Sequence, residues 1–144
     1  MGQQQLLLIV LGIIIVGIAI AVGVNMFQSN AVDTNRQAVI SDLANLAAKA
    51  QRYYRTPSQL GGGSQNFKGF SLGRLDKENG NGFYRLATSA PTAPSDTTST
   101  TSISTSTTTI YIVGWGTEKG NDGTNRVEAY TKVTGDSLLT TIIN

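Results

Sequence analysis

Residues Leu6–Val24 read LLLIVLGIIIVGIAIAVGV, and this stretch decides how the rest of the chain is interpreted. It contains no polar side chain. As an α-helix it is about 28 Å long at 1.5 Å per residue, close to the hydrocarbon thickness of a bilayer. A segment in lipid must pair its backbone polar groups internally, so we expect a helix. The stretch therefore predicts a helix that lies in a membrane or among other apolar helices.

The flanks of this segment differ from those of a cleaved secretory signal. No Lys or Arg precedes it, and it is longer than the usual ~7–15-residue apolar region of a signal peptide. We therefore expect it to remain in the mature protein. Gly12, Gly17 and Gly23 interrupt it. They are explained either by the tolerance of membrane helices for glycine or by close helix packing and local opening.

The composition of the chain excludes several kinds of chemistry. Its 144 residues include no Cys and no His, and the formal net charge is +2. The chain therefore lacks thiol nucleophiles, disulfides, the commonest general base and the commonest metal ligand. We expect no enzyme activity and no cofactor or metal. The basic residues are scattered and do not form the patch expected of a nucleic-acid-binding protein.

The helical pattern continues beyond the apolar segment. Between residues 32 and 54, apolar side chains recur at intervals of three, four or seven residues, which places them on one helix face. Arg36 interrupts this stripe, and the opposite face carries polar residues that include Asp42. The side chains expected to pack on a C-terminal head are Val39, Leu43, Leu46, Ala50 and Tyr53.

The end of this helix is marked by Thr56–Pro57, because the residue before a proline avoids the helical conformation. We therefore predict one helix from about Gln3 to about Arg55. From Asn66 onward the pattern changes to a period of two, typical of strands. The expected strands cover residues 82–89, 110–115, 126–133 and 137–143.

These elements predict an α+β fold in which a long N-terminal helix packs on a small C-terminal antiparallel sheet. The helix is apolar at first and then amphipathic. We divide the chain into an apolar segment at 1–29, an amphipathic helix at 30–56 and a β-rich head at 57–144. An antiparallel sheet of this kind has one covered face and one solvated face.

Residues 88–109 are mostly Ser and Thr, with Pro91 and Pro94 among them. One interpretation is an exposed loop that leads into a Thr-rich strand at 102–109. The other is O-glycosylation, which Ser/Thr tracts with Pro attract. The candidate glycosylation sites are Thr97, Thr98, Ser99, Thr100, Thr101 and Ser102.

This architecture resembles the type IV pilin and pseudopilin superfamily over the whole chain. The resemblance rests on the apolar run that continues into an amphipathic helix, on the Gly61–Gly63 connection and on the small sheet. Ala47–Pro57 (AAKAQRYYRTP) is also similar to the end of the long helix in bacterial pilins. The resemblance implies a precursor in the cytoplasmic membrane with its head outside. Pilus assembly machinery would then build copies of it into an extracellular filament.

The resemblance also implies which residues form the filament core. Subunit-packing positions in the apolar helix would be Leu6, Leu7, Leu8, Ile9, Val10, Leu11, Ile13, Ile14, Ile15, Val16, Ile18, Ile20 and Val22. The family has a glutamate a few residues into the mature chain, and Gln3, Gln4 and Gln5 stand there in this sequence. A neutral amide avoids the desolvation of a buried carboxylate and still forms hydrogen bonds.

We expect these glutamines to bond to one another or to backbone between neighbouring subunits, or else to form a polar collar at the membrane interface. The family's leader peptide ends in glycine, but Met1–Gly2 is shorter than such a leader and has no basic residue. Two alternatives to a filament subunit remain. One is a minor pseudopilin of a secretion or uptake machine. The other is a single-span membrane protein that displays a small binding domain.

Overall fold

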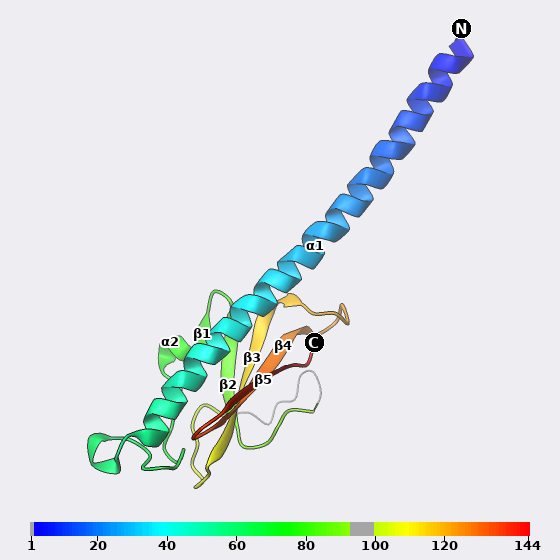
Figure 1. The fold of residues 1–144 in the computed structure, drawn as a ribbon. Helices are drawn as coiled ribbons and strands as arrows, with labels where there is room; N and C mark the ends of the chain where they lie inside the picture. Colours follow the sequence, from blue (N-terminus) through cyan, green and yellow to red (C-terminus); the bar gives the residue numbers. More distant parts are fainter. Residues whose placement is uncertain (1, 93–99) are drawn as a thin grey trace.

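The computed structural model describes residues 2–92 and 100–144 (Figure 1). A 54-residue helix, α1 (Gly2–Arg55), runs from the N-terminus to the far end of the head. Its C-terminal half packs on a five-stranded sheet, and its N-terminal half projects away from the head. The predicted α+β fold is confirmed.

The sheet is antiparallel throughout, and its strands follow one another in sequence order. They are β1 (Glu78–Asn79), β2 (Gly82–Ala87), β3 (Thr109–Lys119), β4 (Arg126–Thr134) and β5 (Leu138–Ile142). Two short helices, η1 (Ser58–Leu60) and α2 (Arg74–Lys77), lie between α1 and the sheet in the sequence. Helix α1 ends at Arg55, two residues before Pro57, where the sequence predicts its end.

The prediction of a strand at 102–109 is wrong. Strand β3 begins only at Thr109, and Ser102 forms an isolated bridge with Ser71. The Thr107 hydroxyl instead donates to the Thr109 carbonyl and accepts from the Thr109 N–H. Such local bonds from Ser and Thr to the backbone compete with strand pairing. The β-propensity of threonine is therefore offset here by its own hydroxyl.

The larger core lies between α1 and one face of the sheet. The helix contributes Val39, Leu43, Leu46, Ala47 and Ala50. The strands contribute alternate residues, because successive side chains of a strand point to opposite faces. These residues are Tyr84, Leu86, Ile110, Ile112, Ala129 and Val133. Phe67, Phe70, Leu72 and Ile103 from the connecting segments complete this core. On the other face of the sheet, Ala87, Val113 and Trp115 form a second, smaller buried cluster, so the expectation that this face is simply solvated is wrong.

Gly114 allows a close approach of helix and sheet. A Cβ atom at this position would lie 2.9 Å from ring atoms of Tyr84 and 3.0 Å from Cγ1 of Val39. A side chain here would therefore push β3 away from α1. Glycine at the centre of this strand keeps the helix in contact with the sheet.

Candidate assembly surface

The free half of α1 presents an apolar surface on all sides. The large apolar side chains between Leu6 and Val24 are 50–70% exposed and do not pack against the head. Every residue expected in a filament core belongs to this surface. Burial of one large apolar side chain contributes about 1.5–3 kcal/mol. The surface therefore requires lipid or other protein chains around it.

Gln3, Gln4 and Gln5 occupy the first turns of α1 and are exposed in the single chain. Their contacts with neighbouring subunits stay a prediction. Among the described residues, α1 is the one helix that is long and apolar enough to cross a membrane. Because α1 is continuous from Gly2 to Arg55, the apolar half and the amphipathic half form one uninterrupted helix.

The amphipathic half is held by its apolar stripe. Val39, Leu43 and Ala50 are fully buried, and Leu46 is nearly so. Tyr53 is partly buried, and its ring lies 5.5 Å from that of Phe70. The Tyr53 hydroxyl donates to the Lys68 carbonyl at 2.7 Å. The stripe thus packs on the sheet and also on the segment that follows α1.

Asn35 and Arg36 fix the helix where it leaves the head. Asn35 Nδ2 donates to the Asn81 carbonyl at 2.9 Å, and Asn35 Oδ1 accepts from the Thr117 N–H at 3.0 Å. Arg36 pairs with Asp33 at 2.7 Å and donates to Asn121 Oδ1 at 2.9 Å. One helical turn is thus bonded to both the β1–β2 turn and the β3–β4 region.

Asp42 lies half-buried and bonds to the head, although the sequence pattern places it on the polar face of the helix. Its Oδ2 accepts hydrogen bonds from Asn79 and Asn81 at 2.8 Å and from the Tyr84 hydroxyl at 2.7 Å. Burial by itself raises the pKa of Asp42, but the bonds from Asn81, Tyr84 and Asn79 lower it below the usual 3.8. Asp42 is therefore a carboxylate at neutral pH.

Tyr84 is the buried partner of this carboxylate. Burial, followed by the hydrogen bond and the negative charge of Asp42, raises the pKa of Tyr84 well above its usual range. The phenol therefore keeps its proton and donates a hydrogen bond to Asp42 Oδ2. This bond joins the middle of the amphipathic helix to the centre of β2.

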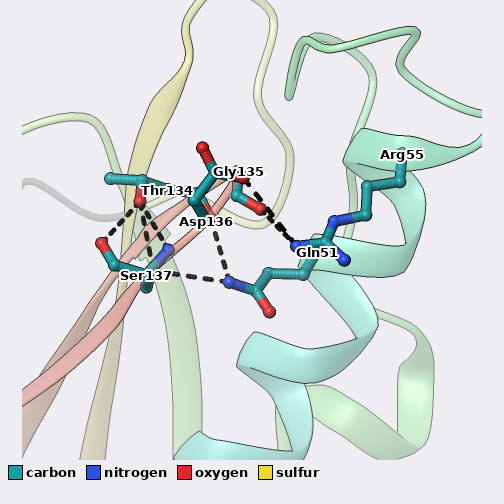
Figure 2. A network of polar contacts seen from close by, with 6 residues as sticks. All are labelled: Gln51, Arg55, Thr134, Gly135, Asp136 and Ser137. Carbon is teal, nitrogen blue, oxygen red and sulfur yellow. Dashed lines mark hydrogen bonds and ion pairs between the residues drawn. The ribbon is translucent and has the colours of Figure 1, made fainter.

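The end of α1 is fixed by contacts with the β4–β5 turn (Figure 2). Gln51 Nε2 donates to the Thr134 carbonyl at 3.1 Å, and Arg55 Nη2 donates to the Gly135 carbonyl at 3.0 Å. Within the turn, the Thr134 and Ser137 hydroxyls lie 2.7 Å apart. Polar contacts at both ends and at the middle therefore lock the helix onto the head.

The sequence pattern does not reveal the contacts that three helix residues make with the head. These residues are Asn35, Asp42 and Gln51. Each lies on the helix outside the apolar stripe, and periodicity alone treats such positions as solvated. The interruption of the stripe by Arg36 is the one signal of the junction. The side chain of Arg36 is only 13% exposed, because it lies against the β3–β4 turn.

Of the candidate glycosylation sites, Thr97, Thr98 and Ser99 fall outside the described residues. Thr100 and Ser102 are exposed, and Thr101 is half-buried. The Thr100 backbone pairs with Leu86, and its hydroxyl donates to the Ser102 carbonyl. Within residues 2–92 and 100–144, no group of three or more acidic, His or Cys residues is placed to hold a metal ion.

The architecture defines a class of protein: a small α+β head carried on a long helix whose free half is apolar enough to span a membrane. Comparisons with protein-family models, with curated proteins and with solved structures found no match to this chain.

Proposed function

We propose that the protein is a pilin-like structural subunit that polymerises through the free half of α1 into an extracellular filament. The observation that supports this most directly is the continuity of α1. One 54-residue helix carries an all-round apolar surface at one end and a locked head at the other. Head and apolar segment are therefore joined by an unbroken helix.

The distribution of apolar side chains favours contact with several partners at once. A helix that dimerises through one seam needs a single apolar stripe, whereas a helix that is apolar all round must be surrounded. Lipid surrounds it before assembly, and copies of the same helix replace the lipid in a filament. The heads, which project to one side of α1, then form the outer wall (Figure 1).

This function implies a membrane-embedded precursor, assembly machinery that extracts it and a homopolymer as the product. Gln3, Gln4 and Gln5 would lie in the apolar core of that polymer and pair there by amide hydrogen bonds. A minor pseudopilin would have the same architecture but would be scarce and would fractionate with membranes. A single-span membrane protein that displays its head would use the apolar helix only as an anchor. This second candidate function is favoured by the length of the apolar segment, which matches the thickness of a bilayer.

The test is negative-stain microscopy of the native assembly together with one helix variant. We expect long fibres from the wild-type protein and none from Ile14→Asp, because a charge in the middle of the packed helices is strongly unfavourable. The matched control is Leu75→Asp, because Leu75 is 86% exposed on the head and outside the apolar helix. Circular dichroism checks that both variants keep their sheets. A wild-type protein that forms no fibres and stays monomeric in lipid would instead be a membrane-displayed domain.

A further inference from the structure

Two asparagines of the chain, Asn79 and Asn81, are followed directly by glycine. Asparagine is a chemically labile residue, because the backbone nitrogen of the next residue can attack its side-chain amide and expel ammonia. Glycine has no Cβ to hinder that approach. The sequence therefore contains two equivalent candidates for this reaction, and the fold distinguishes them.

Gly80 lies in the turn between β1 and β2, next to Asn79. It is exposed, and a Cβ atom added to it would meet no atom within 4 Å. Within residues 2–92 and 100–144, its N–H forms no hydrogen bond. The nitrogen that would attack is therefore open to solvent and is not held by the sheet. Asn79 itself is also exposed.

The side-chain carbonyl of Asn79 faces the same turn. Its Oδ1 accepts hydrogen bonds from the Asn81 N–H at 2.9 Å and from the Gly82 N–H at 3.2 Å. Attack of the Gly80 nitrogen on Cγ of Asn79 develops negative charge on this oxygen. Backbone N–H groups aimed at such an oxygen stabilise the charge. The turn therefore favours the first step of the reaction at Asn79.

The second candidate, Asn81, has a different environment. Gly82 is the first residue of β2 and pairs with Gly116 of β3. Its N–H already donates to Asn79 Oδ1, and a Cβ atom at Gly82 would collide with the Trp115 carbonyl. Asn81 is also half-buried. The sheet therefore fixes the nitrogen that would have to approach the Asn81 side chain.

We propose that Asn79 is a site of spontaneous deamidation in the folded protein and that Asn81 is protected. The Gly80 nitrogen bonds to Cγ of Asn79 and gives up its proton, the bond from Cγ to Nδ2 breaks, and ammonia leaves with that proton. Water then opens the resulting succinimide ring to an aspartate or an isoaspartate at position 79. The reaction consumes only water and does not depend on filament assembly.

The product changes the contact between the β1–β2 turn and α1. Asn79 Nδ2 lies 2.8 Å from Asp42 Oδ2, so deamidation replaces a hydrogen-bond donor to Asp42 with a second carboxylate. Two like charges then face each other at short range. Two cations line the same pocket as Asp42: Lys49 already pairs with Asp76, and Arg52 lies about 15 Å along α1 from Asp42. Deamidation should therefore weaken the contact at the middle of the helix.

The experiment follows both asparagines in the full chain. The protein in detergent is incubated at mildly alkaline pH in water enriched in heavy oxygen, and is then digested in ordinary water. Trypsin cuts after Lys77 and Arg85, so both asparagines fall in the peptide 78–85, and mass spectrometry of its fragments separates them. We expect severalfold more labelled acid at Asn79 than at Asn81. In the chain unfolded by guanidinium chloride, the two should react at similar rates.

A change at Gly80 tests which nitrogen attacks. Gly80→Ala should slow the reaction at Asn79 severalfold in the folded chain, because a Cβ hinders the attack. The fold accommodates this change, because the space around Gly80 is open. The matched control is Leu75→Ala on the nearby helix α2, where Leu75 is 86% exposed. It should leave the rate unchanged.

The consequence for the fold is tested with two variants at position 79. Asn79→Asp carries the charge of the product, whereas Asn79→Ala only removes the hydrogen bond. We expect Asn79→Asp to lower the midpoint of thermal unfolding at neutral pH more than Asn79→Ala does. In an Asp42→Asn background this difference should disappear, because the opposing charge is gone.

Three outcomes would overturn the proposal. Equal labelling of the two asparagines in the folded chain would show that the fold does not select Asn79. No labelling of Asn79 in the folded chain, over a time in which the unfolded chain reacts, would show that the turn protects it. Equal midpoints for Asn79→Asp and Asn79→Ala would show that the new charge does not weaken the contact with Asp42.

Discussion

Asn35 shows how much of the junction between helix and head depends on one side chain. Its amide bonds to Asn81 and to the Thr117 N–H, and its Nδ2 also lies 3.2 Å from the Thr117 hydroxyl. A planar amide both donates and accepts, so one residue satisfies backbone groups from two separate turns. Such a contact positions the turns without contributing apolar area.

Replacing Asn35 with alanine should lower the free energy of unfolding by about 1–2 kcal/mol, because it leaves backbone groups of Asn81 and Thr117 without their partner. Chemical denaturation of the full chain in detergent measures this change. Gln37→Ala is the matched control, because Gln37 is exposed on the same turn. We expect it to change stability by less than about 0.5 kcal/mol. Equal effects of the two changes would show that the Asn35 bonds contribute nothing.

The lowered pKa of Asp42 predicts that the stability of the fold depends on pH. Its pKa in the folded chain is below the usual 3.8, so the carboxylate stabilises the fold above that value. This contribution is lost as the pH falls through 3.8 towards the lower pKa of the folded state. The stability difference between the wild type and Asp42→Asn should therefore be greatest near neutral pH and shrink in acid.

Denaturation curves at a series of pH values measure this difference. Asp136→Asn is the control, because the Asp136 side chain is fully exposed and lies 3.9 Å from Arg55. Its difference from the wild type should stay small at every pH. A difference for Asp42→Asn that is constant from neutral to acid pH would contradict the assignment of the three hydrogen bonds to a carboxylate.

At the scale of elements, α1 has two halves with different environments. The N-terminal half has no contact with the core, whereas the C-terminal half supplies one wall of it. Both halves follow one helical path without a proline. The change from all-round to one-sided apolarity occurs near Val32, where the helix meets the head.

Leu43→Ala should destabilise the head by about 2–5 kcal/mol, because Leu43 is fully buried between α1 and the sheet. Leu60→Ala is the matched control, because Leu60 is 78% exposed, and should change stability by less than about 0.5 kcal/mol. Thermal or chemical denaturation followed by circular dichroism distinguishes the two. A small effect of Leu43→Ala would mean that the helix does not form a wall of the core.

For the whole molecule, the fold separates a head with its own core from a helix half whose apolar side chains are exposed in the single chain. The core cluster draws only on residues from Val39 onward. The surface of the helix between Leu6 and Val24 stays open in the single chain. Stability of the head and assembly of the molecule are therefore expected to respond to different changes.

A chain of residues 28–144 should keep the rest of α1 and the sheet. It should stay monomeric in buffer and form no fibres. The deletion removes exposed apolar side chains and leaves the core and the Asn35, Asp42 and Gln51 contacts in place. Size-exclusion chromatography and two-dimensional NMR measure its state, and the full chain in detergent is the reference. An unfolded fragment would show that the apolar half supports the head.

The amino-acid sequence by itself determined the long helix, its apolar half, its end before Pro57 and strands β2 to β5. These features depend on local preferences: hydrophobic period, the restriction before proline and β-branched side chains. Only the tertiary structure decided the two-residue strand β1, the loop path through Ser102 and the inward role of Asn35, Asp42 and Gln51. Their partners lie tens of residues away along the chain, so these contacts depend on which segments meet, which local periodicity does not encode.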